Sequence, residues 1–241
     1  IQLVGLQNST VSSRSLLGSA FNAISVGRLD GNHSRSTVSL VDSASDGAYE
    51  NARHRPDLVV PLGATSYTTP VAAAAAALLL EAGDGQANAA RAEVIRAVFM
   101  AGADPFTACQ CTDMIGDFRA APGDRAENGG DVRYGAGQLN VCNNHQIIAA
   151  GEPTGGGDIA AAGFDYVASF GGLNSSDTVS YFFTADEEHS WLKVALVWHL
   201  DIHGYVFSTF INTATYYDLD LILYDITDGA TVVAASRSQW D

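Results

Sequence analysis

Three short apolar runs in the first quarter of the chain predict the strands of an α/β domain. They are residues 1–8 (IQLVGLQN), 22–31 (NAISVGRLDG) and 55–63 (RPDLVVPLG), and each ends in polar or turn-forming residues. An unbroken apolar run, as opposed to an alternating one, is typical of a strand buried on both faces of a parallel sheet. We therefore expect these runs to be parallel strands of one sheet.

Three further segments carry helical patterns. Residues 71–80 are all Ala, Val or Leu, and a helix that is apolar on every side is expected to be buried. Residues 87–103 place apolar side chains three and four positions apart before Gly102, which predicts an amphipathic helix and its end. Residues 139–151 are predicted to form a last helix, and the Gly-, Asp- and Pro-rich residues 104–134 a long surface loop.

The pattern changes after a Gly- and Pro-rich stretch, residues 151–158 (GEPTGGGD), which we interpret as a linker. Residues 159–241 hold β-branched and aromatic runs separated by turn residues, a pattern typical of an antiparallel β-sandwich. The predicted fold is therefore α/β over residues 1–150, a parallel sheet flanked by helices, followed by the linker and by a β-sandwich that looks truncated.

The charge balance argues against two classes of partner. The chain has 241 residues, with 12 Lys and Arg against 27 Asp and Glu, and a formal net charge of -15. Such a charge argues against nucleic acid and anionic membranes, and the longest apolar run is about half of what a membrane-spanning helix needs. An acidic chain with a single lysine, Lys193, suits a secreted, extracellular protein or a salty medium.

Both ends of the sequence look cut. The chain begins with Ile1 and shows neither the basic region nor the apolar region of a signal peptide. Its last residues are predicted to form a strand and a turn. We expect a mature chain or a fragment.

The residues before the Ala-rich helix indicate a candidate chemistry. Thr65, Ser66, Thr68, Thr69 and Pro70 precede it, and a Ser at a helix N-terminus exposes its hydroxyl beside unpaired backbone N–H groups. These groups and the helix dipole favour the negative charge that develops in acyl transfer. The same pattern fits a plain buried helix with Ser66 as its N-cap, in which Pro70 removes only the first helical hydrogen bond.

Four stretches, in order, resemble the subtilisin-like serine proteases. Residues 63–72 (GATSYTTPVA) resemble the family's serine motif, G-T-S-x-A-x-P followed by V-A, and residues 55–63 resemble its K-P-D-V-V-A-P-G. Residues 22–27 (NAISVG) resemble its central strand, and residues 133–141 (RYGAGQLNV) resemble its Y-G-x-G-x-V-N/D segment. The resemblance covers about 140 residues and implies a serine endopeptidase, a hydrolase of polypeptide substrates.

The resemblance implies that Ser66 is the catalytic nucleophile. It also implies that Asn8, in VGLQNST, is the side-chain donor of the oxyanion hole, which the family places at a strand end in A-G-N. Without the resemblance, Asn8 is a polar residue at the end of a strand. Leu6 and Gln7 replace the family's small Ala-Gly, so Leu6 would narrow the primary specificity pocket.

The mechanism also needs a His base and an Asp that orients it. The family's order is Asp, His, Asn, Ser, yet neither Asp nor His precedes Asn8 in this chain. His33 and His54 lie in segments that look like loops, and each is expected to be a solvated surface residue. We expect the C-terminal piece of a longer protease, which is inactive alone and whose partner is the missing N-terminal half of the catalytic domain. The alternative is a non-catalytic remnant or binding protein that retains the protease fold.

The cysteines allow two interpretations. Cys109, Cys111 and Cys142, together with His145, have the residue types of a zinc site. In a secreted protein a disulfide from the loop to the last helix, or free thiols, is favoured. We therefore expect no zinc.

Alternating aspartates occur late in the chain, at Asp218, Asp220 and Asp225 in YYDLDLILYD. Paired carboxylates can hold a structural calcium ion, whereas a solvated strand face is the favoured interpretation. The segment resembles a D-L-D-L-x-L-Y-D strand of β-sandwich domains that follow bacterial subtilisin-like catalytic domains. No cofactor is expected.

Overall fold

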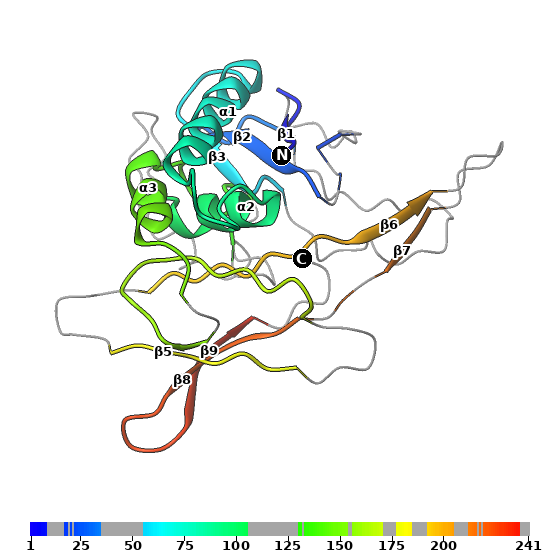
Figure 1. The fold of residues 1–241 in the computed structure, drawn as a ribbon. Helices are drawn as coiled ribbons and strands as arrows, with labels where there is room; N and C mark the ends of the chain where they lie inside the picture. Colours follow the sequence, from blue (N-terminus) through cyan, green and yellow to red (C-terminus); the bar gives the residue numbers. More distant parts are fainter. Residues whose placement is uncertain are drawn as a thin grey trace.

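The computed structural model describes residues 1–8, 17–18, 20, 22–34, 55–105, 130–131, 133–153, 156–170, 177–184, 192–204, 212–215, 217 and 219–236. Figure 1 shows a sheet and three helices built from the first part of the chain, with the later strands below them in that view. Among the described residues, no helix is both long enough and apolar enough to cross a membrane. His54, Cys109, Cys111 and Asp218 lie outside the described residues.

The three N-terminal apolar runs form one parallel sheet, as predicted. Its strands are β1 (Leu3–Gly5), β2 (Ile24–Arg28) and β3 (Leu58–Val60), in the order β1-β2-β3. Both pairs are parallel. β3 is fully buried and β2 nearly so, whereas β1 at the edge is half-buried. The expectation of burial for an unbroken apolar run thus holds for β2 and β3, and only in part for the edge strand β1.

Three helices accompany the sheet, and their bounds differ from the predicted ones. α1 spans Thr65–Ala82, α2 spans Ala92–Gly102 and α3 spans Val141–Ala150. α1 begins six residues before the Ala-rich run and one residue before Ser66, near which its start was expected. α2 begins later than predicted, with Arg91 as its N-cap, and α3 begins at the Asn140 cap.

α1 is buried on one side only, so the prediction of a helix buried all round is wrong for the described structure. Its inner face contributes Ala72, Ala75, Ala76 and Leu79 to the main hydrophobic core. The same core contains residues of β2, β3, α2 and α3 (Ile24, Val26, Leu58, Val60, Val94, Ile95, Val98, Phe99, Ile148). The outer face exposes Tyr67, Val71 and Leu78. The Ala and Leu pattern could not show this, because it is apolar on both sides.

Gly5 allows α1 to lie close to β1. A Cβ added at Gly5 would lie 2.5 Å from Thr69 Oγ1 and 3.3 Å from Thr65 Cβ. Heavy atoms in van der Waals contact lie about 3.5 Å or more apart, so any side chain at this position would push the first turns of α1 away from the sheet. The edge strand and the helix that carries Ser66 are therefore packed through a glycine.

The C-terminal region contains paired strands, in three separate two-stranded sheets among the described residues. β6 (Asp201–Gly204) and β7 (Asn212–Thr215) pair antiparallel, as do β8 (Leu221–Asp225) and β9 (Thr231–Ser236). The antiparallel pairing agrees with the predicted pattern. β4 (Gly157–Asp158), within the predicted linker, instead pairs parallel with β5 (Tyr181–Phe182).

Residues that follow the predicted linker also contribute to the α/β core. Phe164 is buried in the main core, and Tyr166 packs against it. Arg91, at the start of α2, lies over the Tyr166 ring at 4.7 Å from its centroid. The side chain of Asn88 donates to both carboxylate oxygens of Glu152, at 2.8 and 3.0 Å. The segment after α3 is therefore held against the α/β unit by both apolar and polar contacts.

Two predictions about cysteine and aspartate receive a partial answer. Cys142 in α3 is an exposed free thiol, so of the two favoured alternatives, a bridge from the loop to this helix or free thiols, the second holds for this residue. Among the described residues, no three His, Cys, Asp or Glu side chains gather in a way that could hold a metal ion. Asp220 is exposed, and Asp225 Oδ1 accepts the Thr227 N–H at 2.9 Å in the turn after β8.

Candidate active site

Ser66 is the second residue of α1 and is exposed to solvent. The interpretation of Ser66 as the N-cap is wrong, because the N-cap position is held by Ala64. The N–H groups of Tyr67 and Thr68 both donate to the Ala64 carbonyl, at 2.9 and 3.0 Å. Within the described part of the chain, no hydrogen bond involves the Ser66 hydroxyl, which therefore points outward from the first turn.

Pro70 lies deeper in the helix than the sequence suggested. With α1 beginning at Thr65, Pro70 is the sixth helical residue, and the N–H that it lacks would have bonded to the Ser66 carbonyl. Two neighbouring side chains reinforce this weakened turn. Thr68 Oγ1 and Thr69 Oγ1 donate to the Thr65 carbonyl at 3.2 and 2.8 Å. The turn that carries Ser66 is thus held by threonine hydroxyls as well as by the backbone.

Asn8, at the carboxyl end of β1, caps this helix from a distance. Its Oδ1 accepts the Thr65 N–H at 2.7 Å and the Thr65 hydroxyl at 3.1 Å, across 57 positions of sequence. A helix leaves its first N–H groups without intrahelical partners, and Asn is among the best residues to accept from them. The structure therefore brings Asn8 beside the residue that immediately precedes Ser66.

The orientation of the Asn8 amide follows from these two bonds. Because Oδ1 is held by Thr65, Nδ2 is turned away from that residue, and no hydrogen bond from Nδ2 to a described residue is present. The Asn8 side chain is exposed, as is Ser66. The exposed Asn8 side chain is therefore bonded to the first residue of α1, and the exposed Ser66 is the second residue, at the positive end of the helix dipole.

The loops after β1 and β2 are tied together next to this position. The Gln7 N–H donates to Ser34 Oγ at 3.0 Å, and the Ser34 N–H donates to the Gln7 carbonyl at 2.8 Å. Leu6 is buried, and its N–H donates to the Val26 carbonyl at 3.1 Å. The carboxyl ends of the parallel strands, where α/β proteins place their ligands, are therefore joined by backbone and serine contacts that hold Asn8 in place.

His33 was expected to be a solvated loop residue, and the structure shows that this is wrong. Its side chain is only 1% exposed, and its Nδ1 lies 3.2 Å from the Ser34 carbonyl. A Cβ placed on Gly27 would lie 2.9 Å from His33 Nε2, so the ring rests on the Gly27 backbone. Burial lowers the pKa of His33 more than the Ser34 carbonyl and the Asp30 charge raise it. His33 is therefore a neutral, packed residue.

Three histidines have described side chains, His33, His145 and His199, and none of them forms a hydrogen bond to Ser66. His33 Nε2 is buried without a hydrogen-bond partner, and His199 Nδ1 lies 3.2 Å from Glu93 Oε1. His145 belongs to α3, 79 positions after Ser66 in the sequence. A base must lie within hydrogen-bond reach of the serine hydroxyl, and within the described ranges no such contact is formed.

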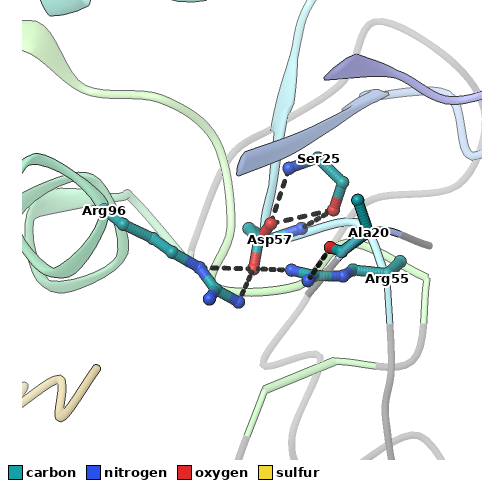
Figure 2. A network of polar contacts seen from close by, with 5 residues as sticks. All are labelled: Ala20, Ser25, Arg55, Asp57 and Arg96. Carbon is teal, nitrogen blue, oxygen red and sulfur yellow. Dashed lines mark hydrogen bonds and ion pairs between the residues drawn. The ribbon is translucent and has the colours of Figure 1, made fainter. Parts of the chain in front are cut away.

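A buried charge network surrounds Asp57 (Figure 2). The sequence patterns did not indicate Asp57 as a candidate residue. Asp57 Oδ1 accepts from Arg55 Nη1 and from Arg96 Nη2, the latter at 2.7 Å. Oδ2 accepts from the Ser25 N–H at 2.6 Å and from the Ser25 hydroxyl at 2.9 Å. Burial alone would raise the pKa of Asp57, but the charges of Arg55 and Arg96 and the Ser25 N–H hold it well below its usual range.

This network joins three elements of the α/β unit. Ser25 belongs to β2, Arg55 and Asp57 precede β3, and Arg96 belongs to α2. The Arg55 Nη2 also donates to the Ala20 carbonyl at 3.0 Å. The sequence does contain a sign of this network, an Asp at the start of an apolar run with an Arg two positions before it. A carboxylate buried at such a place must be paired with a positive charge.

No family profile matches the sequence, and no curated protein sequence matches it either. The site must therefore be interpreted from its own geometry. An exposed serine at a helix N-terminus, next to an oriented amide, can stabilise negative charge on a bound carbonyl oxygen. It can also attack that carbonyl, provided that a base removes the serine proton.

Proposed function

We propose that the chain carries the nucleophile and the oxyanion donor of a subtilisin-like serine endopeptidase, which cleaves peptide bonds in polypeptide substrates. The observation that carries this proposal is the 2.7 Å hydrogen bond between Asn8 Oδ1 and the Thr65 N–H. It ties a strand-end Asn to the residue before an exposed helical Ser, across 57 positions of sequence. The motif resemblance requires that these two residues lie close together in space, although they are far apart in the sequence.

In the proposed reaction, Ser66 Oγ attacks the carbonyl carbon of the scissile peptide while a base takes the hydroxyl proton. The electron pair of the carbonyl moves onto its oxygen, and this oxyanion is stabilised by Asn8 Nδ2–H and by the dipole at the start of α1. The base then returns the proton to the leaving amine as the tetrahedral intermediate collapses to an acyl-enzyme. Water hydrolyses the acyl-enzyme by the same steps.

The base and its orienting carboxylate are proposed to come from a segment that precedes Asn8 in the longer protein. The motif order Asp, His, Asn, Ser implies this, and neither His33 nor His199 is hydrogen-bonded to Ser66. Under the same proposal the protein acts outside the cell, and residues 159–241 form a β-sandwich beside the catalytic domain. The acidic charge of the chain and its antiparallel strand pairs support this part.

The test uses a fluorophosphonate probe, which forms a covalent bond with activated serines. The chain is expressed alone and as the longer product that includes the coding sequence upstream of Ile1. We expect no labelling of the chain alone and labelling of the longer protein at Ser66, lost in Ser66→Ala. Labelling at another residue, or labelling that survives Ser66→Ala, would contradict the proposal.

Two substitutions at Asn8 separate its two roles in the longer protein. Asn8→Asp keeps an acceptor for the Thr65 N–H but removes the amide donor, whereas Asn8→Ala removes both. We expect Asn8→Asp to retain the thermal stability and to lower kcat by about 10²–10³-fold, as for other oxyanion donors. Asn8→Ala should show the same loss of kcat and also lose about 1 kcal/mol of stability, since a cap is removed. Full activity of Asn8→Asp would exclude Asn8 from the oxyanion hole.

The alternative is a binding protein that keeps the fold and has no chemistry. It is favoured by the unpaired Ser66 hydroxyl and by the buried, neutral state of His33. A longer protein that folds cooperatively, fails to label and fails to cleave casein would support this alternative.

A further inference from the structure

Lys193, the single lysine of the chain, reaches from the C-terminal region into the α/β unit. Its Nζ donates to the Ala103 carbonyl at 2.8 Å and to the Ala136 carbonyl at 2.7 Å. Ala103 is the C-cap of α2, where a cation is favoured by the helix dipole. Ala136 lies before α3 and donates its own N–H to the Asp57 carbonyl at 2.8 Å. One ammonium group therefore joins the end of α2 to the loop beside the Asp57 network.

A second contact lies seven residues further along the same segment. Asn22 Nδ2 donates to the Leu200 carbonyl, and the Leu200 N–H donates to Asn22 Oδ1, both at 2.9 Å. The Asn22 side-chain amide thus makes two hydrogen bonds to the backbone of Leu200, as a residue of a neighbouring β-strand would. Asn22 lies just before β2, so this contact reaches a different element of the α/β unit from the one that ends at Ala103.

The residues between the two contacts run along the α/β unit. From Leu192 to Val197 the side chains alternate between exposed and half-buried, with Lys193, Ala195 and Val197 on the half-buried side. His199 Nδ1 lies 3.2 Å from Glu93 Oε1 of α2. Seven residue steps in extended form span at most about 25 Å, which is enough to cross a small domain.

We propose that residues 193–200 form an intramolecular clasp that opens and closes as one unit. The clasp is held by the Lys193 hydrogen bonds at one end and by the Asn22–Leu200 hydrogen bonds at the other. Its closure holds the C-terminus of α2, the loop before α3 and the start of β2 in fixed relative positions. The two ends lie seven positions apart in sequence and bond to different parts of the α/β unit, so a cooperative clasp predicts a coupling between them that independent contacts would lack.

Acylation of amines tests the clasp, because the chain has only two, the Lys193 side chain and the Ile1 α-amino group. The full chain receives short pulses of an acetylating ester, and mass spectrometry of the digested protein gives the rate at each amine. Ile1 is exposed and serves as the internal reference. We expect Lys193 to react at least about tenfold more slowly in the native chain than in the urea-unfolded chain, because reaction requires local opening.

Coupling is tested with Asn22→Ala, which removes the contact at the far end. We expect Lys193 to acetylate about threefold faster or more, with the Ile1 rate unchanged, as local opening becomes more frequent. Asn88→Ala is the matched control, since Asn88 also joins the α/β unit to a later segment, through Glu152, but outside the clasp. It should leave the Lys193 rate unchanged. Equal acceleration in both variants would show detachment of the whole C-terminal region and would overturn the clasp.

The reverse coupling uses hydrogen exchange at the other end. Lys193→Met keeps most of the length of the side chain and removes the ammonium. We expect the Leu200 amide, bonded to Asn22 Oδ1, to exchange faster in Lys193→Met than in the native chain, because the clasp opens more often once the Lys193 contact is lost. An unchanged Leu200 exchange rate, or a native Lys193 as reactive as in the unfolded chain, would refute the proposal.

Discussion

Asp57→Asn removes the carboxylate that both Arg55 and Arg96 contact in a buried charge network, and it should be severely destabilising. In the native chain this carboxylate is 4% exposed and accepts hydrogen bonds from Ser25, Arg55 and Arg96. The Asn amide would take the Asp57 charge away from two largely buried guanidinium groups. Removing one partner of a buried ion pair costs about 3–5 kcal/mol. That is a large part of the roughly 5–15 kcal/mol that holds a typical domain together.

Urea unfolding at neutral pH, followed by far-UV circular dichroism, measures this loss. We expect the unfolding midpoint to fall with little change in the urea dependence, since the fold itself is retained. Asp30→Asn is the matched control, because Asp30 pairs with Arg28 near the surface, with 25% of its side chain exposed. A pair of that kind contributes about 1 kcal/mol or less. If Asp57→Asn lost no more stability than Asp30→Asn, the network would not be a source of stability.

The pH dependence gives a second check on the same reasoning. The pKa of Asp57 is lowered in the folded chain, so the unfolded chain takes up the proton first as the pH falls. The stabilisation is therefore complete above about pH 4, the pKa of a free Asp, and is lost below it. The difference between the native chain and Asp57→Asn should be constant above about pH 5 and should narrow in acid.

Two further predictions concern His33 and Gly5. Burial lowers the pKa of His33, so its contribution to the free energy of unfolding is complete above about pH 6.5 and falls by up to about 1.4 kcal/mol per pH unit below it. His33→Phe should therefore make the melting temperature less dependent on pH between neutral pH and pH 5. An unchanged pH dependence would contradict this. Gly5→Ala should cost about 1–3 kcal/mol in urea unfolding, because its Cβ would meet Thr69 Oγ1. Gly63→Ala, with no atom within 4 Å of the new Cβ, is its control and should change little.

The sequence predicted the sheet and the helices because these depend on local patterns. Unbroken apolar runs marked β1, β2 and β3, and the Ala and Leu run marked α1. The N-terminus of α1 could not be predicted in the same way, since its cap is Asn8, 57 positions away. The local pattern offered Ser66 as the cap, and only the packing of β1 against α1 shows that another residue supplies the acceptor.

His33 and Asp57 were misjudged or missed for a related reason. A His after a turn-forming Asp-Gly pair is normally exposed, but here the ring lies on the Gly27 backbone, where the absence of a side chain makes room. Asp57 lies in an apolar run, and its partners come from β2 and from α2. Burial of polar residues depends on such distant partners, which a pattern along one segment does not contain.

The long-range cap on α1 also has a consequence for folding kinetics. The middle of the helix can form from the propensity of Ala and Leu alone. Its first turn gains the Asn8 contact only after the intervening chain has closed into a loop, and that closure costs entropy. Substitutions at Thr65 should therefore accelerate unfolding more than they slow folding. The turn that carries Ser66 is then the last part of the helix to become ordered and the first to fray.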